Sequence, residues 1–378
     1  MKTDLDIEIR KEVQEYIKVL RENSNRENKK AKDSLEKVVF TEIRQSLFNG
    51  EYVDRFVIFL KGTGCSLVKE VGGCTFCGFY NATNFGEKIS DASYMTQIQE
   101  VMKNPINYPV ICLYNDGSML REEEISFSVV KDMFRIFSEI NSVKKIVIES
   151  KIEDITEEKL SVLRSITQKE IEIAVGFESA NSVIRDLCIN KSFENKIFES
   201  RLEIAKKYNI NIIPLMIVKP PFLTEEEAIA DYVNSLIYLD QFNLKRIDME
   251  LPTVEKGTLV YDLWINNQYK TAKLWSIIEI IKTKHNLNLK TPIYISPQNY
   301  SVKAEDFSTN CSKCNGLIND AFNQYNRNLD VSIFDNIDCD CKKKWEELIS
   351  EEKQEKSIQE RIVNSMNLLK NKNKSTAS

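Results

Sequence analysis

The sequence has a single histidine, no long apolar run and no excess of basic residues. The single histidine, His285, excludes Ser-His-Asp triads and histidine-rich metal hydrolase sites. No apolar stretch approaches the ~20 residues that a membrane-spanning helix needs, so we expect no contact with a membrane. The N-terminus is charged and lacks an apolar secretory core. We therefore expect a cytoplasmic protein.

The charge balance also limits the function. With 52 Lys and Arg against 57 Asp and Glu, the net charge of the 378 residues is −5. A non-specific nucleic-acid binder usually carries a basic excess, so the total charge does not indicate one. No stretch matches the phosphate-binding pattern GxxxxGK[ST], which leaves ATP hydrolysis without support.

Short β-branched, apolar runs alternate with helical patterns along the middle of the chain. This alternation predicts a parallel sheet with helices on its outer face, in an α/β fold that forms a partial (β/α)6 barrel. The expected strands are 55–61, 110–115, 145–150, 171–177, 210–218 and 245–251. The expected helices lie near 94–104, 122–140, 156–166, 193–208, 224–242 and 273–286, before a short strand at 292–296.

Three domains follow from this pattern. Residues 1–50 are expected to form a helical extension that contains an amphipathic helix over 5–23. Residues 51–300 form the barrel core. Residues 301–378 form a cysteine-bearing segment, with a long charged helix over 343–371.

Three of the nine cysteines, Cys65, Cys74 and Cys77, lie in a glycine-rich loop directly after the first core strand. Three soft thiolates suit a 4Fe–4S cluster and leave one iron without a protein ligand. The alternative is a structural zinc site that borrows a distant fourth cysteine, Cys112 or one near the C-terminus. Structural zinc sites, however, usually pair their ligands as two close couples.

This loop resembles that of the radical S-adenosylmethionine (SAM) superfamily, although its first gap is eight residues where three are common. The resemblance implies that the amino and carboxylate groups of SAM chelate the open iron. It also implies reductive cleavage of SAM to a 5′-deoxyadenosyl radical, and an electron-donor protein of the flavodoxin or ferredoxin type.

Polar residues at the ends of several apolar strands strengthen the resemblance, because such residues converge on one rim of a barrel. Any one of them can be a helix cap, but this explains the whole set poorly. For Lys219, a solvated rim lysine is the equal alternative. The implied SAM contacts are Phe76, Gly117, Ser118, Glu149, Ser150, Glu178, Ser179, Arg185 and Lys219.

Residues 217–231, 254–264 and 273–281 resemble a subgroup that contains the elongator catalytic subunit and the archaeal archaeosine-forming enzyme. The resemblance implies modification of a tRNA base, by cleaving a carbon–nitrogen bond of a lysine attached to a deazaguanine, with a tRNA-binding enzyme as a candidate partner. One alternative is a peptide or small metabolite as substrate, which the acidic balance suits. Another is a non-catalytic iron–sulfur or zinc module that docks on a partner.

A second cysteine set follows the barrel: Cys311 and Cys314 form a CxxC, and Cys339 and Cys341 form a CxC. Two close couples are typical of a closed four-thiolate site. We expect zinc or a second 4Fe–4S cluster there, with unliganded thiols as the alternative. Cys112 and Cys188 are expected to be core thiols.

Overall fold

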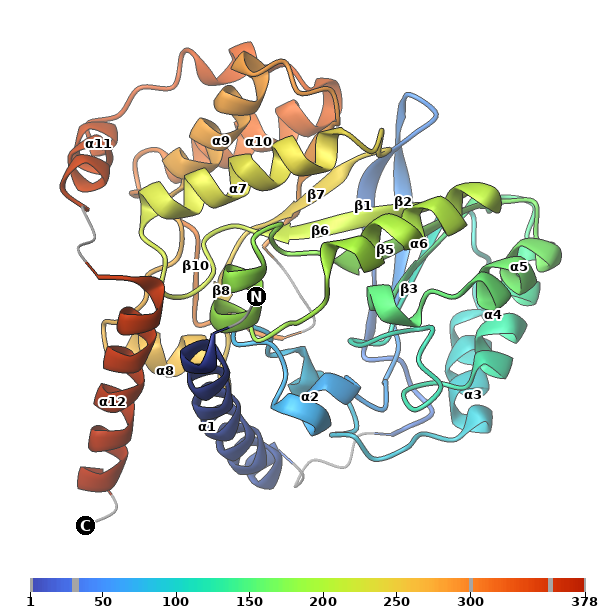
Figure 1. Ribbon diagram of the computed structural model, residues 1–378. Helices are drawn as coiled ribbons and strands as arrows, with labels where there is room; N and C mark the ends of the chain where they lie inside the picture. Colours follow the sequence, from blue (N-terminus) through green and yellow to red (C-terminus); the bar gives the residue numbers. More distant parts are fainter. Residues whose placement is uncertain (1–2, 29–33, 299–301, 353–355, 377–378) are drawn as a thin grey trace.

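The computed structural model describes residues 3–28, 34–298, 302–352 and 356–376. Its centre is a curled sheet of eight strands in the order β1-β2-β3-β4-β5-β6-β7-β9 (Figure 1). β1 pairs antiparallel with β2, and all other neighbours are parallel. The strands are β1 (Phe40–Phe48), β2 (Glu51–Phe59), β3 (Val110–Tyr114), β4 (Lys145–Glu149), β5 (Glu170–Gly176), β6 (Ile210–Ile217), β7 (Ile247–Glu250) and β9 (Ile293–Ile295). β8 (Thr253–Val254) and β10 (Asp306–Phe307) form a separate two-stranded sheet.

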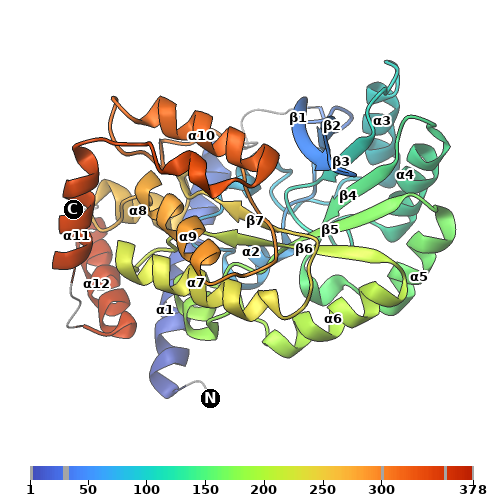
Figure 2. The same ribbon diagram turned by 90° about the horizontal axis from the view of Figure 1, so that it is seen from above.

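Helices cover the outer face of this sheet from α3 round to α9 (Figure 2), while α1, α2, α8 and α12 lie together at another side of the molecule (Figure 1). The helices are α1 (Asp4–Asn28), α2 (Ser66–Val71), α3 (Asp91–Val101), α4 (Phe127–Glu139), α5 (Glu157–Ile166), α6 (Asn195–Lys207), α7 (Glu225–Asp240), α8 (Leu259–Ile265), α9 (Leu274–Asn286), α10 (Asn315–Asn328), α11 (Cys341–Glu351) and α12 (Ile358–Thr376).

The expected fold class is confirmed. The six strands expected in the core correspond to β2 to β7, which are adjacent in that order and parallel. The helix after β6 begins as its sequence predicts: the Thr224 side chain accepts from the Glu227 N–H at 3.1 Å, and the Glu227 carboxylate accepts from the Thr224 N–H at 3.0 Å. This reciprocal capping box fixes the first turn of α7.

Two strands extend the sheet beyond the expected six. β9 is the short strand expected near residues 292–296. β1 lies inside the expected helical extension, so the helical prediction holds for α1 and is wrong for residues 40–48. A sequence signal for this hairpin exists: Asn49-Gly50 connects β1 to β2 with φ values of 52° and 81°, as the favoured two-residue hairpin turns require.

The expectation of one charged helix over 343–371 is also wrong, because α11 and α12 are separate. Ser357 accepts from the Glu360 N–H at 3.2 Å, and Glu360 accepts from the Ser357 N–H at 2.8 Å. This second capping box starts a new helix at α12.

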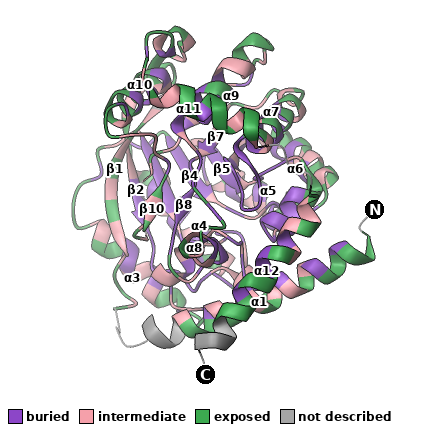
Figure 3. Ribbon diagram, turned by 90° about the vertical axis from the view of Figure 1, so that its left-hand side faces the viewer, coloured by how far each residue is buried: buried purple, intermediate pink, exposed green. Residues whose placement is uncertain are grey.

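Three hydrophobic cores hold the elements together, and Figure 3 shows buried residues along the strands and on the inner sides of the helices. The largest core lies between the sheet and its outer helices. A second joins α1, α8 and α12, with Cys74 and Phe76 at its border. A third, small core lies on the opposite face of the sheet, inside the barrel, and contains Val57, Phe59, Val110, Cys112 and Val147.

The inner face of the barrel also carries charge at the amino-terminal ends of β4, β5 and β7. Glu172 is 2% exposed and accepts from Lys145 Nζ at 2.6 Å and from Arg246 Nη1 at 2.7 Å. Lys145 also lies 3.4 Å from Glu170, and Arg246 lies 2.8 Å from Asp248. Burial alone would raise the pKa of Glu172, but Arg246 and Lys145 outweigh it and hold that pKa at about 2. We call these five residues the inner charge cluster.

We predict that Glu172→Gln lowers the free energy of unfolding by about 1.5–3 kcal/mol at neutral pH, because it removes the buried carboxylate that Lys145 and Arg246 share and leaves each cation with one acidic partner. The contribution of Glu172 is complete above its unfolded pKa of about 4.3 and disappears as the pH falls toward 2. Urea denaturation of both proteins should therefore show a difference that narrows in acid. The matched control is Glu170→Gln, whose 3.4 Å contact with Lys145 and 3.3 Å hydrogen bond from Asn211 predict a loss below about 1 kcal/mol, because Glu170 is more exposed than Glu172. Equal losses in the two variants would contradict the prediction.

Candidate functional site

The three-cysteine loop lies at the carboxyl end of β2. Cys65 stands at the N-terminus of α2, and Cys74 and Cys77 follow that helix. The six residues of α2 fill most of the long gap between Cys65 and Cys74. Gly72 and Gly73 then turn the chain back with φ values of 87° at both positions, a conformation that favours glycine. The unusual spacing of this motif therefore holds one short helix.

Arg21 of α1 binds the backbone of this loop, although it lies far away in sequence. Its side chain is 3% exposed. Nε donates to the carbonyl oxygen of Gly72 at 3.3 Å, and Nη2 donates to the carbonyls of Cys74, at 3.4 Å, and Cys77. Nη1 is buried without a hydrogen-bond partner among the described residues. Arg21 thus fixes the loop and brings a positive charge close to its thiols.

The chemistry of the three thiols fits a cluster. Burial raises the pKa of Cys65 to about 12, and it also raises the pKa values of Cys74 and Cys77. Thiolates there need compensating positive charge, which a bound metal supplies. The three sulfurs are not grouped within 4.8 Å of one another, as the ligands of one small ion would be. In a 4Fe–4S cube each thiolate binds a different iron, which needs the wider spacing.

Glu124 connects the cysteine loop to the neighbouring strand end. Its carboxylate accepts from the Ser66 N–H at 2.7 Å and from the Ser118 N–H at 2.6 Å. A Cβ atom at Gly117 would lie 2.1 Å from the same carboxylate and 3.4 Å from Cys65 Cα. Only glycine fits there, so the loop after β3 packs directly against the first cysteine.

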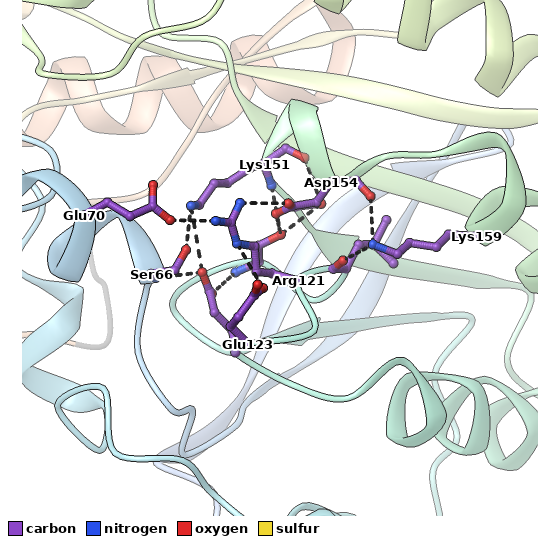
Figure 4. A network of polar contacts seen from close by, with 11 residues as sticks. Ser66, Glu70, Arg121, Glu123, Lys151, Asp154 and Lys159 are labelled. Carbon is purple, nitrogen blue, oxygen red and sulfur yellow. Dashed lines mark hydrogen bonds and ion pairs between the residues drawn. The ribbon is translucent and has the colours of Figure 1, made fainter.

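A polar network extends from this point along the rim (Figure 4). Lys151 donates to Ser66 Oγ at 2.8 Å, and Arg121 bridges Glu70, at 2.6 Å, and Asp154, at 3.1 Å. The network joins α2 to the segments that follow β3 and β4. It thereby holds the cysteine loop in position relative to the sheet.

The first group of expected SAM contacts comes together next to the loop. Glu149 accepts from the N–H groups of Asn115, at 2.8 Å, and Gly117, at 3.3 Å. Ser118 Oγ lies 3.1 Å from Ser150 Oγ and donates to Asp154 at 2.6 Å. Burial raises the pKa of Glu149 to about 7. In this structure these side chains hold the strand-end loops together.

The second group follows β5. Glu178 has a left-handed φ of 67° and accepts from Lys191 Nζ at 3.1 Å. Ser179 Oγ donates to Asp231 at 2.8 Å. Burial raises the pKa of Cys74, with the Glu178 carboxylate contributing and the Lys191 ammonium opposing. Glu178 therefore lies on the same rim as the cysteine loop.

Arg185 and Lys219 have protein partners. Arg185 is 0% exposed, donates to the Phe193 carbonyl at 2.6 Å and to Asn195 Oδ1 at 2.8 Å, and stacks 3.9 Å over the Phe193 ring. Lys219 is buried and donates to Glu225 at 2.7 Å, so it is not a solvated rim lysine. Contact of either residue with SAM remains a prediction.

Asn115 is the clearest binding group that the sequence did not single out. It directly follows β3, is 1% exposed, and neither its Nδ2 nor its Oδ1 has a hydrogen-bond partner among the described residues. A buried amide without partners is rare and costly unless a ligand or water binds it. Its position at a strand end could have marked it in the sequence.

Other residues around the loop carry no local sequence signal, because their partners are distant in the chain. Arg21 binds Gly72 across 51 positions. Glu255 accepts from the Gly78 N–H at 2.5 Å across 177 positions, and burial raises the pKa of Glu255 to about 7.

The C-terminal cysteines form a compact group, with the ligand atoms of Cys311, Cys314, Cys339 and Cys341 all within 4.8 Å of one another. The Sγ atom of Cys311 lies 3.5 Å from that of Cys314 and 3.6 Å from that of Cys339. The Sγ atoms of Cys314 and Cys341 lie 3.5 Å apart. Tetrahedral zinc with ~2.3 Å bonds places its sulfurs ~3.8 Å apart. This group can hold a single metal ion.

The remaining two thiols lie as expected. Cys112 and Cys188 are buried in apolar surroundings. His285 is exposed at the end of α9.

No protein-family model matches the chain. An uncharacterized protein of Methanocaldococcus jannaschii is 31% identical over 346 residues, which cover 89% of this chain and 93% of that protein. The archaeosine synthase subunit beta of Methanosarcina acetivorans is 29% identical over 307 residues, covering 80% and 87%. The chain belongs to the same family as the M. jannaschii protein, and its relatives support the radical SAM subgroup that the sequence resembles.

A solved structure is also similar to this chain. The queuine lyase of Clostridium spiroforme, bound to SAM and queuine, matches 69% of this chain and 98% of its own at 19% identity and a TM-score of 0.45. None of the described helices combines the length and apolar character that a bilayer crossing requires.

We predict that the C-terminal cysteine group of this radical SAM protein binds about one zinc ion per chain, because its sulfur spacing suits one tetrahedral ion. Metal analysis of a variant with Cys65, Cys74 and Cys77 changed to alanine isolates this group. Adding Cys314→Ser should release the zinc and lower the melting temperature. About four irons in the first variant would instead indicate a second cluster.

Proposed function

We propose that Cys65, Cys74 and Cys77 bind a 4Fe–4S cluster and that the protein cleaves SAM reductively beside it. The observation that carries this proposal is that three cysteines lie in one loop after β2, which Arg21 binds and which packs on the loop after β3. The cations of Arg21, Lys151 and Lys191 compensate part of the thiolate charge, as their effects on the thiol pKa values indicate. The zinc alternative needs a distant fourth cysteine, but Cys112 belongs to the barrel interior and the four C-terminal cysteines form a group of their own.

When bound, the cluster would supply an electron to the sulfonium of SAM, and the resulting 5′-deoxyadenosyl radical would abstract a hydrogen atom from the substrate. The chain's own residues would hold the cofactor. Asn115 offers a free amide to SAM next to the first cysteine. Phe76, half-buried beside Cys74, offers a ring to the adenine. Glu149 keeps the loop after β3 in the shape that exposes these groups.

For the substrate, we propose a tRNA base that carries a lysine, whose carbon–nitrogen bond is cleaved to leave an amidine. Support comes from two relatives named archaeosine synthase subunit beta, of which this chain covers 87% and 90%. These relatives are subunits, which also suggests a partner protein. The partner would supply the basic tRNA-binding surface that the net charge of −5 does not indicate for this chain. Electrons would come from a flavodoxin- or ferredoxin-type protein.

A second candidate is a peptide or a small metabolite as the substrate of the same radical chemistry. The same net charge of −5 favours it, because phosphate backbones bind basic surfaces.

We predict that Cys65→Ala, Cys74→Ala or Cys77→Ala abolishes 5′-deoxyadenosine formation, because each removes one iron ligand. The assay uses protein reconstituted anaerobically with iron and sulfide, then reduced with SAM present. Cys112→Ala is the matched control and should retain both iron content and SAM cleavage. If the triple alanine variant still cleaved SAM, the cluster assignment would be wrong.

We predict further that the reduced enzyme converts tRNA carrying a lysine-bearing deazaguanine into tRNA with a new amidine nucleoside, detected by mass spectrometry after nuclease digestion. The reaction is run with and without a candidate partner subunit. Active SAM cleavage with no new nucleoside in either case would favour the peptide or small-metabolite substrate.

A further inference from the structure

Three cations lie around the cysteine loop, and they differ in how their charge is compensated. Lys151 lies 4.0 Å from the Glu124 carboxylate, and Lys191 lies 3.1 Å from the Glu178 carboxylate. Arg21 is 3% exposed and forms no ion pair among the described residues. Arg21 is therefore the cation of this group whose charge no bound carboxylate offsets.

The guanidinium of Arg21 lies against the backbone of the cysteine loop. Nη2 donates to the carbonyls of Cys74, at 3.4 Å, and Cys77. Burial lowers the pKa of Arg21, and the thiols of Cys77, Cys74 and Cys65 oppose this effect, Cys77 most strongly. A guanidinium stays protonated in proteins. A positive charge is thus buried close enough to act on all three thiols.

Two features leave this charge free to act on a bound group. Glu255 is the carboxylate that most favours the charge of Arg21, but it accepts from the Gly78 N–H at 2.5 Å and from the Thr253 hydroxyl at 3.0 Å instead of pairing with Arg21. Arg21 Nη1 is buried without a hydrogen-bond partner among the described residues. Such an N–H group is costly unless it finds an acceptor. The sulfur atoms of a cluster are acceptors that only the loaded protein contains.

We propose that the charge of Arg21 raises the reduction potential of the cluster held by Cys65, Cys74 and Cys77. This inference rests on the proposed function, which puts a 4Fe–4S cluster in this loop. Reduction transfers one electron from the donor protein to the cluster, so the negative charge of the cluster and its three thiolates grows by one. A buried cation nearby stabilises the reduced state more than the oxidised state. A hydrogen bond from Nη1 to a sulfur would act in the same direction.

This role is separate from the structural role of the same side chain. The hydrogen bonds to the carbonyls of Gly72, Cys74 and Cys77 hold the loop, and their loss should reduce the amount of iron that the loop retains. The charge acts on the electron that the cluster accepts, and its loss should change the potential. With the charge present, a less strongly reducing donor protein suffices.

The test measures the midpoint potential of the cluster by redox titration followed by electron paramagnetic resonance, without SAM. It uses the full-length protein, reconstituted anaerobically with iron and sulfide. The variants are Arg21→Gln, which removes the charge but keeps N–H donors, and Arg21→Lys, which keeps the charge but loses the fork. The variant with Cys65, Cys74 and Cys77 changed to alanine supplies the background signal.

The matched control is Arg164→Gln. Arg164 of α5 resembles Arg21 in that it donates to backbone carbonyls, among them those of Tyr208, at 2.9 Å, and Asn209, at 2.8 Å. None of its carbonyl partners belongs to the cysteine loop. This control therefore removes a carbonyl-binding arginine without removing charge near the thiols.

We expect Arg21→Gln to lower the midpoint potential by at least about 59 mV, which is a tenfold smaller equilibrium constant for one-electron reduction. Arg21→Lys should stay closer to the wild type than to Arg21→Gln, and Arg164→Gln should leave the potential unchanged. Iron is measured in every sample, so that potentials are compared at equal cluster content.

An unchanged potential in Arg21→Gln, or an equal fall in Arg21→Gln and Arg21→Lys, would overturn the inference. If Arg21→Gln held no iron, Arg21→Lys would decide: a potential near that of the wild type supports the role of the charge, and loss of iron there too would make Arg21 structural alone. A wild type whose three-cysteine loop binds no iron would refute the proposed function. A loaded wild type with an unchanged potential in Arg21→Gln would refute this inference alone.

Discussion

The contact between Arg21 and the cysteine loop is the constraint on which the candidate site depends. A loop with two left-handed glycines has no regular backbone pairing of its own, so its carbonyls need donors from elsewhere. Arg21 donates hydrogen bonds to the carbonyls of Gly72, Cys74 and Cys77 from α1, which precedes the barrel in the chain. α1 can do so only because its apolar face packs in one core with α8 and α12. The first and last helices of the chain therefore support the geometry of the thiols.

The barrel interior divides into two environments with different physical roles. The apolar patch around Val57, Cys112 and Val147 keeps part of the interior free of water. The inner charge cluster holds three carboxylates and two cations in four ion pairs, and such pairing is how buried charges become tolerable. Arg55 of β2 lines the same cavity as this cluster, and as a third cation it brings the total charge of the six residues to zero.

The sequence alone predicts the parts of this fold that local patterns determine. Runs such as Ile210–Ile217 are apolar on both faces because they are buried on both faces, so all six core strands could be found. β1 was missed because FTEIRQSLF mixes polar and apolar residues on an exposed edge, although its Asn-Gly turn was readable. The two cysteine sites could be predicted from the spacing of their cysteines, and the rim loops from the ends of the apolar strands. Arg21, Glu124 and Glu255 could not be found, because only the folded chain brings them to the loop.

The C-terminal cysteine group has a structural consequence for the opposite side of the barrel. Cys314 is the residue before α10, so an ion held by the four thiols would fix the start of that helix. The Trp275 N–H donates to Cys341 Sγ at 3.2 Å, which also ties the group to α9. The inward face of α10 supplies Asn319, Phe322, Asn323 and Asn326 to the wall of a cavity of about 800 Å³ along the open edge of the sheet, and Asn326 accepts from the Ile295 N–H of β9 at 2.9 Å. The segment beyond the barrel thus covers the edge that the sheet leaves open, and loss of a bound metal would loosen this wall while leaving the three-cysteine loop intact.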